Sequence, residues 1–510
     1  MKVRRFARPL AVALLLGVTV PYAIADILPL LPTFGWATFA HGPEHQGLSA
    51  TPAQNILSIK WQTPVDLNPQ YSGSVLYAHY GSPLSTARNT IVLPVKTGAT
   101  DGFKVEGRRG SNGHLMWTQT TDYSVPSHSW FPVCQPTLLP DNEVMIPAAG
   151  GTVLRRTNAD LVAGSATRLC FYGLANYNAA QSTYNSRVKI DTPIVSDLYG
   201  NVYFGFRVSG TNPQNLVSGM ARISHAGVGS WVAASTASGD ALSNYVQHNC
   251  APALSLDGTV LYFGVRNSSG STNCYLVGID STTLAPLYKV KVKDPNSGNN
   301  ARVIDDSTSS PCIGPDGDVY FGVLENPGGS NHSRGWMLHY NSTLTVTKIP
   351  GAFGWDHTPS IVPASCVPSY TGNSPYLLFS KYNDYYSGSP GSGMNKIAVL
   401  DPRVSQIDSA TGATVMKEVM TKLGPTLDWQ NPPTAVREWC LNASVVDPFT
   451  KAAFANSSDG SVYRWDFTTN SLTQTVALTP GILEAYTPTV MGADGKVYAM
   501  NNAAVYACGQ

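Results

Sequence analysis

Histidine, carboxylate and aromatic side chains recur at one kind of place in this chain, just before a repeated strand-opening phrase. Histidine has an ordinary pKa that lets it act as acid, base or metal ligand near neutral pH. His248, His357, Asp356 and His79 are therefore the candidates for acid–base catalysis. The candidate ligand-binding residues at these places are His79, Tyr80, His128, Trp130, Arg187, Asp191, His248, Asp356, His357, Trp439 and Tyr486.

The phrase that follows these residues occurs eight times. Each copy has a polar or small residue, then proline and a short apolar run, and most copies continue into an Asp-Gly-type turn and a second strand. Proline suits the first position of a strand, and Asp-Gly suits a tight hairpin. Recurrence at intervals of about 45 to 84 residues predicts an array of small sheets. The copies begin at Ser82, Gln135, Thr192, Ala251, Ser310, Thr358, Asn442 and Thr487, and the seventh has alanine in place of proline.

Eight such units predict an all-β fold, an eight-bladed β-propeller of four-stranded antiparallel blades, as a single domain over residues 26–510. The last copy leaves too few residues for a fourth strand, so the run from Ile56 to Val65 should close the ring. It belongs to an entry segment, residues 26–66, and an insertion rich in Tyr, Gly and Ser spans about residues 382–394. Loops that precede inner strands surround one mouth of a propeller's funnel, so we expect the candidate residues to converge there.

The first 25 residues indicate a secretory signal peptide. Basic residues precede an apolar run from Leu10 to Val20, and Ala23-Ile24-Ala25 then precedes Asp26. We expect the mature chain to begin at Asp26, to be periplasmic or extracellular, and to have no transmembrane segment. Charged residues make up only 13% of the chain and the net charge is +1, so no nucleic-acid partner is predicted.

Eight cysteines without any Cys-x-x-Cys spacing favour disulfides over a metal cluster in an exported chain. Cys134 and Cys250 precede the proline of their repeats by the same distance, and Cys170 and Cys274 fall at the expected third strand. The sequence thus predicts the bridges Cys134–Cys170 and Cys250–Cys274. Four more cysteines would complete the set in an order that the spacing leaves open: Cys312, Cys366, Cys440 and Cys508.

No metal site is predicted. His41 and His45 flank Glu44, but a surface segment is the simpler interpretation of that triplet. Asp-Gly pairs at the hairpins stand alone, without the further carboxylates that calcium requires.

The expected outer strands carry degenerate copies of the docking phrase Asp-x-x-Thr-Gly-x-x-x-Trp. Residues 408–416 keep the Asp, Thr and Gly, residues 112–117 and 227–231 keep glycine and tryptophan, and residues 280–288 keep Asp, Thr and an aromatic ring. Together with the opening Trp36 to Gly47, these phrases resemble those of the quinoprotein alcohol dehydrogenase-like (PQQ-like) β-propeller superfamily. The resemblance implies a divergent secreted propeller in which tryptophans wedge between neighbouring blades.

Dehydrogenases of that superfamily bind pyrroloquinoline quinone (PQQ) with calcium or a lanthanide, and many stack the quinone on a ring formed by two adjacent cysteines. This chain has no Cys-Cys pair and no Cys-x-x-Cys-His haem motif. No cofactor is therefore predicted, and PQQ with Ca²⁺ is the one that the resemblance allows.

Two classes of function fit these observations. The first is an exported binding or scaffold protein that holds a small-molecule, glycan or protein ligand over the funnel, a role suited to the abundant Tyr and Trp. The second is an enzyme on the same funnel, either a divergent quinone-dependent alcohol or sugar dehydrogenase or a polysaccharide-cleaving propeller. No nucleophile motif or paired-carboxylate signature is present, so binding is the favoured interpretation and catalysis stays an open alternative.

Overall fold

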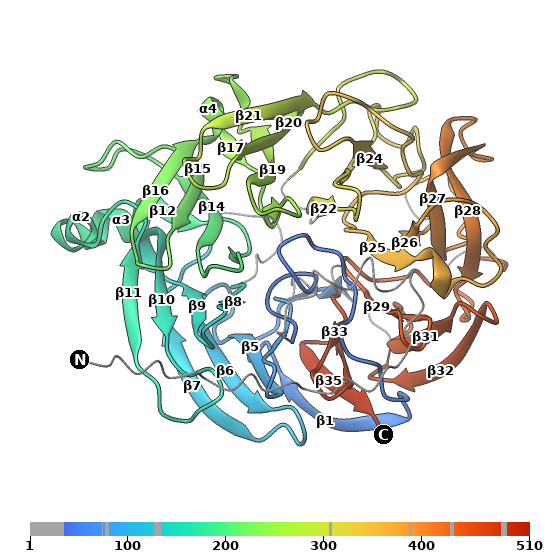
Figure 1. Cartoon of the computed structure of the whole chain (residues 1–510), viewed down its shortest axis with the longest axis horizontal. Coiled ribbons are helices and arrows are strands. Elements are labelled where there is room, and N and C mark those ends of the chain that lie inside the picture. The colour runs from blue at the N-terminus through green and yellow to red at the C-terminus, as the bar shows by residue number, and fades with distance from the viewer. Residues whose placement is uncertain are drawn as a thin grey trace, which may run out of the picture.

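A computed structural model describes residues 35–73, 75–76, 81–126, 134–304, 309–386, 389–428, 433–480 and 487–510. Within these residues, eight antiparallel sheets follow one another around a central axis, with their short first strands innermost (Figure 1). The predicted eight-bladed all-β propeller is thereby confirmed. No helix in the described ranges combines the length and the apolar character that a membrane crossing requires.

Blades 1 to 4 occupy the first half of the ring. Blade 1 comprises β4 (Leu84–Ser85), β5 (Thr90–Lys96), β6 (Phe103–Arg109) and β7 (Leu115–Thr121), and blade 2 comprises β8 (Thr137–Leu138), β9 (Val144–Pro147), β10 (Thr152–Arg156) and β11 (Ala166–Cys170). Blade 3 comprises β13 (Val195–Ser196), β14 (Val202–Val208), β15 (Gly219–Ile223) and β16 (Gly229–Ala233), and blade 4 comprises β18 (Ala253–Leu254), β19 (Val260–Asn267), β20 (Gly270–Asp280) and β21 (Pro286–Lys291).

Blades 5 to 8 complete the ring. Blade 5 comprises β22 (Cys312–Ile313), β23 (Val319–Val323) and β24 (Trp336–Tyr340), and blade 6 comprises β25 (Ser360–Pro363), β26 (Tyr376–Tyr382), β27 (Lys396–Ile407) and β28 (Thr414–Leu423). Blade 7 comprises β29 (Val445–Asp447), β30 (Ala452–Asn456), β31 (Ser461–Asp466) and β32 (Ser471–Ala477), and blade 8 comprises β33 (Val490–Met491), β34 (Val497–Asn501), β35 (Ala504–Gly509) and β1 (Ser58–Pro64).

The remaining elements are short. Two further strands pair with the second strands of blades 3 and 4, and a hairpin follows the closing strand. The strands are β12 (Val188–Ile190) and β17 (Tyr245–Val246), the hairpin is β2 (Tyr71–Ser72) with β3 (Val75–Leu76), and the helices are η2 (Ala149–Gly151), α2 (Leu174–Ala179), α3 (Gln181–Arg187), α4 (Ala234–Ser238) and η3 (Ala364–Cys366).

Blade 5 departs from the four-stranded pattern. In place of an outer strand it has two isolated bridges, Met337 with Gly351 and Tyr340 with Thr347. The long β27–β28 hairpin of blade 6 contacts the outer segment of blade 5, where the Met416 N–H donates to the Pro350 carbonyl at 2.8 Å. Met416 stands where the docking phrase has tryptophan, so the degenerate phrase still joins two blades.

The ring closes as the strand count predicted. β1 pairs antiparallel with β35, with Ser58 opposite Gly509 and Pro64 opposite Ala504. The N-terminal strand thus covers the edge that the last blade would otherwise expose.

Hydrogen bonds between blades explain the polar residue of the repeated phrase. The Ala251 N–H donates to Ser310 Oγ at 2.9 Å, and the Ser310 N–H donates to Thr358 Oγ1 at 2.9 Å. The sequence separations of these bonds, 59 and 48 residues, are the intervals between successive copies of the phrase. In the copies that begin at Ser310 and Thr358, the small hydroxyl residue therefore links its inner strand to the preceding one.

Residues 36–49, which we call the plug, run inside the ring (blue in Figure 1). They exchange hydrogen bonds with the inner strands of seven blades in chain order. The plug atoms involved are the carbonyls of Trp36, Ala37, Pro43, Glu44, Gln46 and Gly47 and the hydroxyl of Thr38, and their partners are Ser85, Leu138, Leu254, Ile313, Ile361, Val446 and Ile194 respectively.

The plug also fills the channel. Phe39 and Ala40 form one buried apolar cluster with Val195 of blade 3, Ala251 of blade 4 and Ala443 of blade 7. Because these blades lie on different sides of the axis, the cluster spans the channel (Figure 1). The channel is therefore closed at the level where the inner strands begin.

The interpretation of His41, Glu44 and His45 as a surface segment was wrong. The side chains of His41 and His45 are buried because they belong to the plug, and His45 Nδ1 lies 2.8 Å from the Pro311 carbonyl. Burial lowers the pKa of each of these histidines to about 4, so both rings are neutral at pH 7.

The predicted disulfides are also wrong, since all eight cysteines are free and buried. Cys170 lies on the outermost strand of blade 2, three strands from β8, which Cys134 precedes. Three strand spacings amount to roughly 14 Å, beyond the Cα separation of about 7 Å that a disulfide tolerates. Cys274 lies in β20, two strands away from β18, and Cys250 precedes β18. The sequence spacing showed that the cysteines occupy equivalent positions in two repeats, but it did not show how many strands separate the two cysteines within a blade. The free cysteines also include Cys312, Cys366, Cys440 and Cys508.

Two tryptophans of outer strands wedge between blades, and the docking phrase predicted this role for Trp117. Trp117 Nε1 donates to the Ala159 carbonyl of blade 2 at 2.8 Å. Trp61 Nε1, on the closing strand, donates to the Gly110 carbonyl of blade 1 at 2.9 Å. Each ring is buried, so these tryptophans fix the angle between neighbouring blades.

Candidate functional site

The candidate site lies on the side of the ring at which the inner strands begin, which we call the entry mouth. Of the expected residues, six are described by the structure, and all but Arg187 are buried. The other expected residues, with the signal peptide of residues 1–25, lie outside the described residues: His79, Tyr80, His128, Trp130 and Tyr486.

Asp191 and His248 meet between blades 3 and 4. His248 Nδ1 is hydrogen-bonded to Asp191 Oδ1, and Arg207 Nε donates to Asp191 Oδ2 at 3.3 Å. The side chains of Asp191 and His248 are both 1% exposed. Burial opposes the charged form of Asp191, but Arg207 and His248 outweigh it and hold the pKa of this carboxyl below its ordinary value. The carboxylate is thus fixed between two basic partners.

Asp356 and His357 lie at the entry of blade 6, where both contact Lys381 of β26. Lys381 Nζ is 2.6 Å from Asp356 Oδ1, and the Lys381 backbone N–H donates to His357 Nε2 at 3.1 Å. Burial raises the pKa of Asp356 more than Lys381 lowers it. Burial, together with the nearby Lys381, lowers the pKa of His357 to about 3, so this ring is a neutral hydrogen-bond acceptor.

Glu438 of blade 7 is only half-buried and lies near Asp356 and Lys381. Burial raises the pKa of Glu438 to about 7. Among its neighbours, Lys381 lowers this pKa and Asp356 raises it. A carboxyl of this kind gains and loses its proton close to neutral pH. Among the residues described, Glu44 of the plug is also half-buried, and burial raises its pKa to about 7 as well.

Two half-buried aromatic rings stand beside these carboxyls. Tyr385 is close to Asp356 and Glu438, and its ring centroid is 6.4 Å from that of Trp355 and 6.1 Å from that of Phe353. Lys381 Nζ lies 5.4 Å from the centroid of the Phe353 ring. Aromatic faces and carboxyls therefore share one wall of the mouth.

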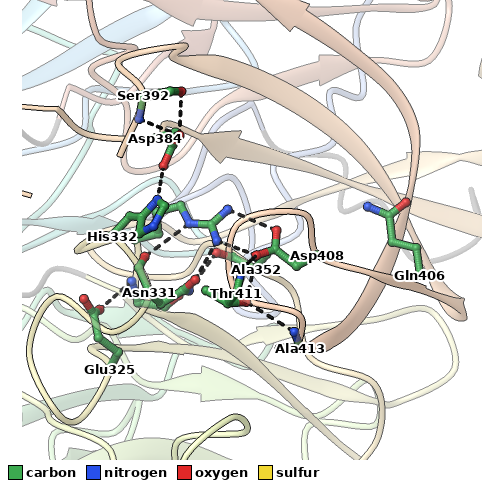
Figure 2. A network of polar contacts seen from close by, with 12 residues as sticks. Glu325, Asn331, His332, Ala352, Asp384, Ser392, Gln406, Asp408, Thr411 and Ala413 are labelled. Atoms are coloured by element: carbon green, nitrogen blue, oxygen red, sulfur yellow. Dashed lines mark hydrogen bonds and ion pairs between the residues drawn. The ribbon is translucent and has the colours of Figure 1, made fainter. Parts of the chain in front are cut away.

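The loop that carries Tyr385 is anchored to blade 5 (Figure 2). His332 Nδ1 is 2.7 Å from Asp384 Oδ1, and Ser392 Oγ donates to Asp384 Oδ2 at 2.6 Å. Nearby, Arg334 donates to Asp408 at 2.8 Å and ties blade 5 to the β27–β28 hairpin. The predicted insertion corresponds to this loop, and its residues 387 and 388 lie outside the described residues.

Two expected ligand-binding residues have other roles here. The Trp439 ring is 1% exposed and packs edge-on against Tyr463 at 5.6 Å, so it does not offer an open face to the funnel. It is held in the core because its backbone exchanges hydrogen bonds with Asn383. Arg187 ends α3 at the rim of blade 3, where its guanidinium donates to the Ser209 carbonyl at 3.0 Å.

The basic partners of the buried carboxylates were not among the predicted residues. Lys381 and Arg207 stand at or near the ends of second strands that are otherwise apolar, and Lys96 ends the second strand of blade 1, 2.9 Å from Asp66. The end of a second strand lies beside the start of the first strand because the two are antiparallel. A single basic residue at the end of an apolar second strand is therefore the sequence signal by which these ion pairs could have been predicted.

The described residues do not fit the calcium-bound quinone of the dehydrogenases. In that part of the chain, no three His, Cys, Asp or Glu side chains are grouped closely enough to hold a metal ion. Asp191 and Asp356, the buried acids of the mouth, already face basic side chains.

No protein-family model matches the chain, and no curated protein sequence matches it. Its structure is similar to that of the quinohemoprotein alcohol dehydrogenase from Comamonas testosteroni, with a TM-score of 0.53, 10% identity, and coverage of 95% of this chain and 82% of that chain. It is also similar to a europium-containing methanol dehydrogenase, with a TM-score of 0.54, 9% identity, and coverage of 93% and 91%. Identities this low show the fold alone. The chain therefore has the propeller fold of the quinoprotein alcohol dehydrogenases, as its docking phrases indicated.

Proposed function

We propose that this chain is an exported binding propeller whose ligand lies over the entry mouth. The observation that carries this proposal is the state of the acid–base groups there. His248 and His357 are 1% and 0% exposed, and Asp191 and Asp356 are held by Arg207 and Lys381. A general acid or base must reach a substrate's proton, and groups enclosed in ion pairs are better suited to shaping a rigid wall.

The parts of the wall that are accessible to a ligand are Tyr385, Trp355 and Glu438. Half-buried aromatic rings offer apolar faces with little loss of side-chain freedom, and the carboxyl adds a polar contact. The plug closes the channel behind them, so a ligand enters and leaves by the same mouth. This surface suits a small molecule, a glycan or an exposed segment of a protein, and the leader sequence supports a periplasmic or extracellular setting for it.

Glu438 favours a second candidate, an enzyme that works at the same mouth. A half-buried carboxyl with a pKa of about 7 suits a general acid or base, and the hydroxyl of the nearby Tyr385 could share the proton. In a polysaccharide-cleaving propeller this pair would serve a sugar hydroxyl or leaving group.

The test measures ligand capture and turnover with the same variants. The mature protein is screened against a panel of oligosaccharides, and Tyr385→Ala is compared with Tyr386→Ala, the neighbouring exposed tyrosine of the same loop. We expect Tyr385→Ala to weaken binding about tenfold and Tyr386→Ala to leave it unchanged, because only Tyr385 packs at the mouth. Equal behaviour of the two variants would argue against this site.

The enzyme alternative is separated by Glu438→Gln and by loading with PQQ and Ca²⁺. A binding protein keeps its affinity within a few-fold in Glu438→Gln and forms no bound chromophore. Turnover of an oligosaccharide that falls about 10²-fold or more in Glu438→Gln would establish the acid–base enzyme instead. A tightly bound quinone with alcohol oxidation would establish the dehydrogenase.

A further inference from the structure

A cavity of about 670 Å³ opens at the rim between blades 2 and 3, away from the channel. Its walls come from the end of β11 and the turn into α2 on one side, and from β16 with its preceding turn on the other. Small-molecule sites have volumes of roughly 300 to 1,000 Å³, so the cavity is of a suitable size. The binding site proposed for the funnel uses none of its residues.

Trp231 distinguishes this cavity from an ordinary surface groove. It ends the docking phrase of blade 3, but it is only half-buried, whereas Trp117 and Trp61 are buried and donate to a neighbouring blade. Its ring packs edge-on against Phe206 at 5.8 Å and lines the cavity. No described residue accepts a hydrogen bond from its indole N–H. Ser230 Oγ, which also lines the cavity, is buried and has no hydrogen-bond partner among the residues described. The cavity therefore has an aromatic wall and two polar groups that are open to a ligand.

The other walls decide the chemistry of the ligand. Leu216 is buried in the wall, and Leu174 and Val228 are exposed at its edge. The charged side chain of the cavity, Arg168, donates to Asp122 at 2.8 Å and is thereby neutralised. A charged ligand would lose its hydration here without a free counter-charge.

We propose that this cavity binds a small uncharged aromatic compound with one hydrogen-bond acceptor, of the phenol class. Its ring would pack on Trp231 and the leucines, and its oxygen would accept the indole N–H. The proposal stands apart from the function at the entry mouth, because the two sites share no residue.

The experiment titrates the purified mature protein with phenol and follows the heat of binding. Saturable binding at one site per chain is expected. Val228→Trp fills the edge of the cavity and should abolish binding, while Leu161→Trp, at a similarly exposed turn of blade 2, should leave it unchanged. Both positions are on the surface, so both variants should fold.

Trp231→Phe keeps a ring and removes the donor, and we expect it to weaken phenol binding about five- to tenfold. Equal affinity in Val228→Trp and the wild type would overturn the proposal, and so would the absence of saturable binding. Glucose binding more tightly than phenol would overturn the aromatic assignment in favour of a sugar site.

Discussion

Replacing Lys381 by methionine tests the buried ion pair at the entry mouth. The side chains of Lys381 and Asp356 are 3% and 6% exposed, and their charged atoms are 2.6 Å apart. Removing one member of a buried pair leaves the other charge desolvated and commonly lowers the free energy of unfolding by about 3–5 kcal/mol. Methionine keeps the length of the lysine chain, so little packing should be lost. We therefore expect Lys381→Met to lose about 3–5 kcal/mol at pH 7.5, as measured by urea unfolding.

The pH dependence of the unfolding free energy provides a second test of this ion pair. The pKa of Asp356 is already raised by burial, and without the ammonium it should rise further. A carboxyl whose pKa is higher in the folded state destabilises that state as pH rises between the unfolded and folded pKa values. The difference between Lys381→Met and the wild type should thus shrink as the pH falls from 7.5 to 5. The double variant Lys381→Met/Asp356→Asn should recover most of the loss. A loss below about 1 kcal/mol, or a double variant no more stable than the single one, would refute a desolvated pair.

Four further predictions follow from the fold and the site. Phe39→Ala should lose about 3–5 kcal/mol in urea unfolding, because its ring packs against blades on different sides of the axis, and a loss near zero would contradict the filled channel. The free energy of unfolding of the wild type should fall as pH rises from about 5 to 7, because Glu438 has a pKa of about 7 in the folded protein and keeps its proton to a higher pH than in the unfolded chain. In Glu438→Gln the contribution of this carboxyl to the pH dependence should be absent. Parallel curves of unfolding free energy against pH for the two proteins would contradict the raised pKa. All eight cysteines should react with a thiol reagent in denaturant without reductant, whereas fewer would reveal a bridge. Mass spectrometry of the exported protein should find Asp26 as its first residue, and an intact leader would exclude cleavage there.

The blades were predictable because their signals are local. Proline at a strand start and Asp-Gly at a hairpin each fix a few dihedral angles, and their recurrence marked every inner strand. The closing strand was predictable by counting, since a ring cannot leave its last edge unpaired. Blade 5 departs from this pattern because its outer segment forms two isolated bridges with β24 in place of a fourth strand.

The candidate site was predictable only in part. The position before each inner strand identified Asp191, His248 and Asp356, but exposure depends on neighbours that are distant in sequence. Lys381 lies 25 residues from Asp356 in the chain, yet antiparallel pairing brings them together. Trp439 was predicted to face a ligand because of its position, whereas the packing of Tyr463 encloses its ring. The local sequence indicated where these side chains lie in each blade, but it did not indicate which residues pack around them.

The plug gives this ring a form of cooperativity that most repeat proteins lack. In a solenoid, each repeat touches only its neighbours, so units can be gained or lost with little effect on distant ones. Here the plug forms hydrogen bonds with the inner strands of seven blades, and the closing strand β1 belongs to the eighth blade. The spacing of polar atoms along residues 36–49 therefore works as a template for the number of blades. A duplicated or deleted blade would put every later contact of the plug out of register, whereas a change in an outer loop would leave these contacts in place.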